Sequence, residues 1–148
     1  MPMFRRATAA DLSAIVAMLA DDTLGAARET DDMAPYRQAF AAIDADPNQF
    51  LCVLEEDDQV IGTMQLTFIA GLSHRGARRG QIEAVRVHRD HRGRGLGRQM
   101  ILWAIDRCRA ERCVMVQLTT DRSRTDAHRF YDSLGFKASH LGYKLVLG

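Results

Sequence analysis

Two periodicities alternate along this chain, and together they predict a mixed α/β fold. Apolar residues recur at helical spacing in some segments and form short, nearly continuous runs, typical of strands, in others. Thr8 to Asp11 resembles a capping box and starts the first predicted helix. Further helices are expected at residues 34–44, 95–111 and 126–134, and strands at residues 3–6, 50–54, 60–69, 81–87, 114–119 and 143–147.

The predicted order is strand, helix, helix, three strands, helix, strand, helix, strand. This order indicates an α/β fold with a sheet of mixed direction. The remaining segments are polar: an acidic connection at 21–32, a turn at 55–59, a basic loop at 71–80 and a loop at 120–125. A length of 148 residues suits one domain with a substantial core, so we expect a single domain over residues 1–148.

The segment 88–97 joins an apolar strand to a long amphipathic helix and is rich in arginine and glycine. A strand that enters a helix through such a turn presents backbone N–H groups to an anion, typically a phosphate. Arginine is the usual bidentate partner of phosphate. The spacing fits neither a Walker A loop nor the dinucleotide fingerprint, because no Gly-Lys-Ser/Thr follows and residue 98 is arginine. A solvated basic turn is the plainer alternative.

Two motifs resolve this choice. Arg92, Gly95 and Gly97 stand in the spacing Arg-x-x-Gly-x-Gly, which resembles the pyrophosphate motif of the GCN5-related N-acetyltransferases (GNAT). The segment 127–136, with Phe130 and Tyr131 before Gly-Phe, resembles a second motif of that family. The element order matches over essentially the whole chain. The resemblance implies the GNAT fold, with a largely antiparallel central sheet flanked by helices.

The resemblance also implies acetyl-CoA as co-substrate and residues that bind it. A bulge in strand 81–87 would open a slot for the pantetheine arm, and a backbone N–H there would stabilise the oxyanion. The family commonly has Asn at the position of Arg124, so this side chain either contacts a phosphate or faces solvent. The expected cofactor-binding residues are Val85, Arg86, Val87, Arg92, Gly93, Arg94, Gly95, Leu96, Gly97, Arg98, Arg124 and Tyr131.

Two side chains are candidates for proton transfer. Glu83 stands in an otherwise apolar strand, where burial would make it a better proton acceptor, and it is the leading general base. An edge-facing or salt-bridged Glu is the alternative, and His74, His88 and His91 are weaker candidates. The resemblance places the hydroxyl of Tyr131 near the departing sulfur as the acid.

The cysteines indicate a reduced, cytoplasmic setting. Cys52, Cys108 and Cys113 lie in apolar stretches, so we expect buried thiols and no acyl-enzyme. The amine should therefore attack the thioester directly in a ternary complex. The N-terminus lacks a signal-peptide pattern, and no apolar run is long enough for a membrane helix. No metal site is suggested.

The charges are segregated along the chain. Residues 1–60 carry 4 Lys/Arg and 12 Asp/Glu, a balance of −8, and residues 61–148 carry 16 and 7, a balance of +9. This split suggests an anionic ligand on the C-terminal half and a cationic amine facing the N-terminal half, although solubility patterning remains an alternative. We expect no nucleic-acid or membrane partner, and family resemblance suggests a homodimer. The competing functional class is a non-catalytic acyl-CoA sensor. The carboxylates that favour a cationic acceptor are Asp21, Asp22, Glu29, Asp31 and Asp32.

Overall fold

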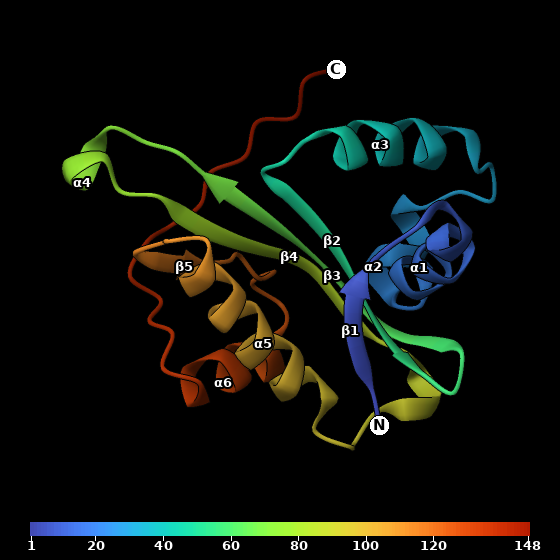
Figure 1. Ribbon diagram of the computed structural model, residues 1–148. Coiled ribbons are helices and arrows are strands. Elements are labelled where there is room, and N and C mark those ends of the chain that lie inside the picture. The colour runs from blue at the N-terminus through green and yellow to red at the C-terminus, as the bar shows by residue number, and fades with distance from the viewer. The chain divides into compact units, whose positions relative to one another are not determined.

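The computed structural model describes residues 1–148 apart from the side chain of Thr23, and it divides into two compact units, Met1–Gln117 and Leu118–Gly148. The first holds a five-stranded sheet in the order β1-β2-β3-β4-β5 (Figure 1). All neighbouring strands are antiparallel except the parallel pair β4 and β5. The strands are β1 (Met3–Arg6), β2 (Gln49–Glu56), β3 (Gln59–Ile69), β4 (Arg79–Val87) and β5 (Met115–Gln117).

Helices lie on both faces of this sheet, with α5 on one side and α1 on the other (Figure 1). The helices of the first unit are α1 (Leu12–Ala20), α2 (Thr23–Arg28), α3 (Ala34–Ala45), α4 (Ser73–Gly76) and α5 (Leu96–Ala110), with short 3-10 turns η1 (Ala9–Asp11) and η2 (Arg89–His91). The second unit holds α6 (Thr125–Ser133). The predicted mixed α/β class with a largely antiparallel sheet is confirmed. Among the described residues, no helix is long and apolar enough to cross a membrane.

The core of the first unit has a layer on each face of the sheet. On the α5 side, Trp103 stacks on Phe4 with ring centroids 5.0 Å apart and contacts Phe50. Strand β3 carries a glycine there because a Cβ at Gly62 would lie 3.0 Å from the sulfur of Met100. On the other side, Ile15 of α1 and the β2 residues Leu51 and Val53 form a buried cluster. This alternation fixes which side chains of β2 and β3 face which helices.

The predicted start of the first helix is confirmed. Asp11 is only 7% exposed, and it accepts a hydrogen bond of 2.7 Å from the backbone N–H of Thr8. Its carboxylate also pairs with Arg5 of β1 at 2.7 Å. The same side chain therefore caps the helix start and ties it to the edge strand.

Four sequence predictions need correction. The final strand predicted at residues 143–147 is wrong: this segment is exposed and forms no strand. The acidic connection at 21–32 contains α2, whose N-cap Asp22 accepts from the backbone N–H of Gly25. The loop at 71–80 contains the single turn α4 and the first residues of β4, and β5 is shorter than the predicted strand at 114–119.

Candidate functional site

A glycine-rich loop connects the end of β4 to α5. Gly93 and Gly95 have φ of 79° and 75°, which side-chain-bearing residues rarely adopt. Apart from the glycine and its immediate neighbours along the chain, no atom of the described residues lies within 4 Å of the position that a Cβ would take at either residue. The loop therefore exposes bare backbone to open space, as a closely approaching ligand requires.

The N-terminus of α5 has no side-chain cap. Gly95 occupies the N-cap position, where it makes no side-chain hydrogen bond, and the first-turn N–H groups of Leu96, Gly97 and Arg98 lack i−4 partners within the helix. The side chain of Leu96 is buried, so only its backbone can reach a ligand. Arg98 is exposed on the same turn. These groups and the helix dipole fit an anion such as a pyrophosphate.

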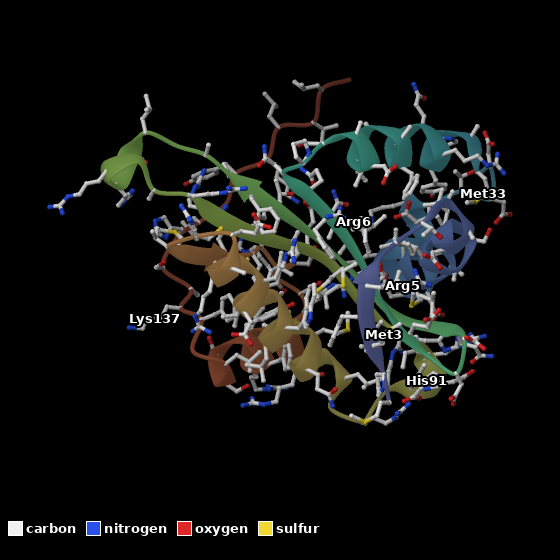
Figure 2. All side chains as sticks on the ribbon, viewed as in Figure 1. Met3, Arg5, Arg6, Met33, His91 and Lys137 are labelled. Carbon is white, nitrogen blue, oxygen red and sulfur yellow. The ribbon has the colours of Figure 1, made fainter. Side chains whose placement is uncertain are left out.

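The side chain of Arg94 contacts other residues of the protein. Its guanidinium donates to both carboxylate oxygens of Glu56 at 2.9 Å and lies 2.8 Å from Nδ1 of His91. This contact lowers the pKa of Glu56. Figure 2 shows His91 beside the turn between β2 and β3. Arg94 therefore anchors the glycine loop to that turn.

Three other arginines of this region lie beside the connection between α1 and α2. The carboxylate of Asp21 is 3.7 Å from both Arg89 and Arg92, and that of Asp22 is 3.5 Å from Nε of Arg86. The Arg86 and Asp22 side chains are 17% and 25% exposed. Two of the carboxylates expected to attract a cationic acceptor therefore face guanidinium groups.

Strand β4 contains the expected bulge. Thr63 of β3 pairs with Arg86, whereas Gln65 pairs with Glu83, so β4 has one extra residue between these pairs. Ala84 lies in this interval with a φ of 53°. Such a bulge bends the strand and disrupts its ladder locally.

Beyond the bulge, β4 has an open edge. Its described pairs with β5 run from Arg79 to Gln81 only. The N–H of His88 donates to Ile61 of β3, so strand alternation directs the N–H of Val87 to the opposite edge. On that edge the carbonyl of Val85 accepts from Arg86 at 2.9 Å, and that of Val87 accepts from Arg92 at 3.4 Å. A ligand that pairs with these carbonyls either shares them with the two guanidiniums or displaces those groups.

Glu83 lies on the face of the sheet that carries α1 and α3. It pairs with Gln65, which is opposite Leu51 of the α1-side cluster. The expectation that Glu83 is buried is wrong: its side chain is exposed. Some of the apolar residues next to Glu83 in the sequence lie on the opposite face of the sheet. The face that carries Glu83 is polar at this point. An exposed carboxylate can still accept a proton from a bound amine.

Tyr131 and Arg124 belong to the second unit. Tyr131 lies in α6, and its ring contacts those of Phe130 and Phe136 at 5.2 and 5.8 Å between centroids. Arg124 is the N-cap residue of the same helix. Both cofactor roles stay predictions.

The cysteines are free thiols. Cys52 and Cys108 are buried, which raises the pKa of their thiols to about 12 and about 11, and Cys113 is half-buried with a raised pKa. Such thiols are poor nucleophiles at neutral pH because the thiolate is scarce. The expectation of buried thiols is confirmed for Cys52 and Cys108.

Comparison with known proteins identifies the family. The family model for the Acetyltransferase (GNAT) family matches residues 14–136. The chain belongs to this family. Acetyltransferases of the GNAT family use acetyl-CoA as donor, and the protein is an acetyltransferase enzyme.

Three relatives cover nearly the whole chain. The aminoalkylphosphonate N-acetyltransferase of Salmonella typhimurium is 29% identical over 143 residues, which is 97% of this chain and 90% of that protein. A crystal structure described as a transcriptional regulator from Bacillus halodurans is 43% identical with a TM-score of 0.95 and covers 99% of this chain and 100% of its own. A putative acetyltransferase from Agrobacterium tumefaciens is 26% identical with a TM-score of 0.87, covering 98% and 99%.

Sequence reasoning missed the partners of the arginines. Glu56 lies 38 residues before Arg94, and Asp22 is 64 residues before Arg86, so no local pattern links either pair. The sequence does contain one signal, which is the Asp22-x-x-Gly25 spacing of an N-cap.

Proposed function

We propose that this acetyltransferase moves the acetyl group of acetyl-CoA to a primary amine by direct attack in a ternary complex. The observation that carries the proposal is the continuity of two features. The open edge of β4 beyond Gln81 runs directly into a glycine loop that precedes the uncapped N-terminus of α5. One extended molecule with amides in its arm and a pyrophosphate at one end matches both.

In this proposal, the N–H groups of residues 95–98 bind the pyrophosphate, and the peptide groups of Val85 and Val87 pair with the pantetheine arm. Acetyl-CoA supplies the thioester. Glu83 accepts the proton that leaves the ammonium of the acceptor, directly or through a water. The amine nitrogen bonds to the acetyl carbon, the carbon–sulfur bond breaks, and the hydroxyl of Tyr131 protonates the departing thiolate. The second proton that the nitrogen loses passes through solvent to the tyrosinate and restores the hydroxyl. The raised pKa values of the thiols support attack without an acyl-enzyme.

Two observations constrain the chemistry of the acceptor amine. A cationic acceptor was expected from five carboxylates of the N-terminal part. Asp21 and Asp22 face arginines, and Glu29 accepts a hydrogen bond of 2.8 Å from the hydroxyl of Tyr36. The Salmonella relative acts on aminoalkylphosphonates, which are amines with an anionic group. We therefore favour an amine that carries an anionic or polar group, and a polyamine such as spermidine is the competing probe.

Thermal unfolding followed by a thiol-release assay tests the function. Acetyl-CoA at 100 times its dissociation constant should stabilise the protein by roughly 2.7 kcal/mol, which raises the Tm by several degrees. The 3′-dephospho form of acetyl-CoA is the comparison ligand in the same unfolding experiment. Amines are then screened for release of free coenzyme A. Absence of any thermal shift at millimolar acetyl-CoA contradicts cofactor binding.

A second candidate is a non-catalytic acyl-CoA sensor that regulates a partner. The 43% identical structure described as a transcriptional regulator favours it. The two candidates separate in the same experiment, because a sensor is stabilised by acetyl-CoA but releases no thiol with any amine. We also propose a cytoplasmic location and a homodimer. Size-exclusion chromatography with light scattering tests the dimer.

A further inference from the structure

One face of the sheet in the first unit carries a continuous polar row that no motif predicts. Four strands each contribute one side chain, and the four are direct neighbours across the ladders. Gln49 pairs with Thr67, Thr67 with Gln81, and Gln81 with Gln117. We call these four residues the glutamine row. All four are half-buried.

The row is held in place by hydrogen bonds between its own members and their neighbours. Oε1 of Gln49 accepts from Thr67 at 3.0 Å and from Gln65 at 2.9 Å. Oε1 of Gln81 accepts from Gln117 at 3.0 Å, and Arg79 donates to the amide oxygen of Gln117 at 3.2 Å. The amides are therefore fixed in orientation before any ligand arrives.

This orientation leaves donors for a ligand. The oxygens of Gln49 and Gln81 face their neighbours, so their Nε2 groups point away from those partners. Within the described part of the chain, no acceptor is assigned to either Nε2 group. Each amide carries two N–H donors, and the guanidinium of Arg79 stands at the end of the row. A surface of fixed N–H donors suits oxygen acceptors such as a hydroxyl, carboxylate or phosphonate.

The row lies next to the proposed reaction site. Gln81 is the last residue of β4 that pairs with β5, so the row crosses β4 where the slot opens. Glu83 follows two residues later on the same face, about 7 Å further along the strand. A small molecule can therefore contact the row with one end and Glu83 with the other.

The composition of this face argues against the alternative that the row is an ordinary solvent-exposed polar surface. The same face is apolar at β2, where Leu51 and Val53 pack under α1 and α3. It is polar at Gln49, the first residue of β2, and toward β4, where Gln65 and Glu83 are opposite each other. Glutamine is not enriched in strands, so three amides and a threonine hydroxyl on one face, linked by hydrogen bonds, indicate a binding surface.

We propose that the glutamine row binds an oxygen-bearing head group of the acceptor and thereby places its amine at Glu83. The proposal rests on the N-acetyltransferase function above. It assigns Gln49, Gln81 and Gln117 as specificity-determining residues for a polar rather than an alkyl amine.

Three amines of equal chain length test this assignment: ethylamine, ethanolamine and 2-aminoethylphosphonate. The wild-type kcat/KM should be at least about tenfold higher for the two oxygen-bearing amines, because a site built to hydrogen-bond rejects the analogue without that group. Gln81→Met keeps the side-chain length and removes the amide. It should lower kcat/KM about tenfold for one or both polar amines, leave the value for ethylamine unchanged, and leave the KM for acetyl-CoA unchanged. A loss of kcat/KM with ethanolamine alone indicates that the row binds a hydroxyl. A loss with the phosphonate alone indicates that it binds an anionic head group.

Gln38→Met, on the exposed part of α3, is the matched control and should resemble the wild type with all three amines. If Gln81→Met does not fold, Gln49→Met takes its place. An equal loss with all three amines, no loss at all, or a changed KM for acetyl-CoA overturns the role of the row while leaving the N-acetyltransferase function intact. If the wild type acetylates none of these three amines but acetylates another amine of the screen, the role of the row is overturned and the proposed function stands. If it binds acetyl-CoA but releases no thiol with any amine of the screen, the proposed function fails and this inference fails with it.

Discussion

Arg94 and Glu56 form two parallel hydrogen bonds of 2.9 Å, which tie the glycine loop before α5 to the turn between β2 and β3. The sequence analysis assigned Arg94 to the cofactor, and the contact gives two distinguishable roles. Arg94 either holds the loop in shape or leaves Glu56 to bind a phosphate.

Glu56→Gln distinguishes these roles. If the pair positions the loop, the variant should bind acetyl-CoA about two- to fivefold more weakly, a modest effect because the pair is at the surface. If Glu56 competes with a phosphate for Arg94, the same variant should bind more tightly. Isothermal titration at two salt concentrations measures the change, and the weaker binding is the outcome that we expect.

Gly95→Ala should impair both folding and binding. The φ of 75° costs a residue with a Cβ roughly 1–2 kcal/mol, which lowers the Tm of a domain of this size by a few degrees. The added methyl group also occupies the space above the loop, so affinity for acetyl-CoA should fall more than stability does. Gly71→Ala is the control, because Gly71 has no positive φ and its Cβ would be 3.5 Å from the nearest atom. Unchanged affinity in Gly95→Ala would remove the loop from the cofactor site.

Glu83→Gln should lower turnover, because the amide cannot accept the proton of the ammonium. An alkylammonium such as that of lysine has a pKa near 10.4, so the free amine becomes abundant only at high pH. The lost rate should therefore recover in part between pH 8 and 10, as thiol release across that range would reveal. A wild-type rate at neutral pH would exclude Glu83 from proton transfer.

Tyr131→Phe should lower kcat with little change in the KM for acetyl-CoA. The substitution removes only the hydroxyl and keeps the ring that contacts Phe130 and Phe136. Tyr143→Phe, in the exposed C-terminal segment, is the matched control. A defect common to both variants, or none in Tyr131→Phe, contradicts a role as acid.

Asp11→Asn should change the pH dependence of stability. Hydrogen bonds from Arg5 lower the pKa of Asp11 below its usual 3.8. The carboxylate therefore contributes stability that is fully present above pH 3.8 and is lost as the pH falls through the lowered value. We expect the variant to lose roughly 1.5–3 kcal/mol at pH 7 and to converge with the wild type in strong acid. Urea unfolding at both pH values measures the difference, and a constant difference would contradict the linkage.

Most elements follow from local patterns, because helices and strands bury one face at a fixed period. Helix α2 escaped this reasoning because it is only six residues long. Its glycine is decided by packing: a Cβ at Gly25 would lie 1.9 Å from the carbonyl oxygen of Leu19. The segment at 143–147 has a strand pattern, but a strand also needs a partner, and local sequence does not supply one.

The glycine loop could be predicted because its motif is contiguous. The sequence placed Glu83 in the correct strand but predicted a buried side chain, which is wrong. Exposure depends on neighbours such as Gln65, which lie opposite Glu83 only after the sheet forms. The glutamine row was out of reach for the same reason. Members that are adjacent in the row lie 14 to 36 residues apart along the chain and become neighbours only through register.

The unpaired stretch of β4 also bears on solubility. A bare strand edge is a template on which another chain can add a strand, and proteins commonly guard such edges with charge. In this unit the carbonyls of Val85 and Val87 are already engaged by Arg86 and Arg92. The two arginines thus protect this edge with positive charge. Replacing both with neutral side chains should promote aggregation before the cofactor is added, and saturating acetyl-CoA should suppress it.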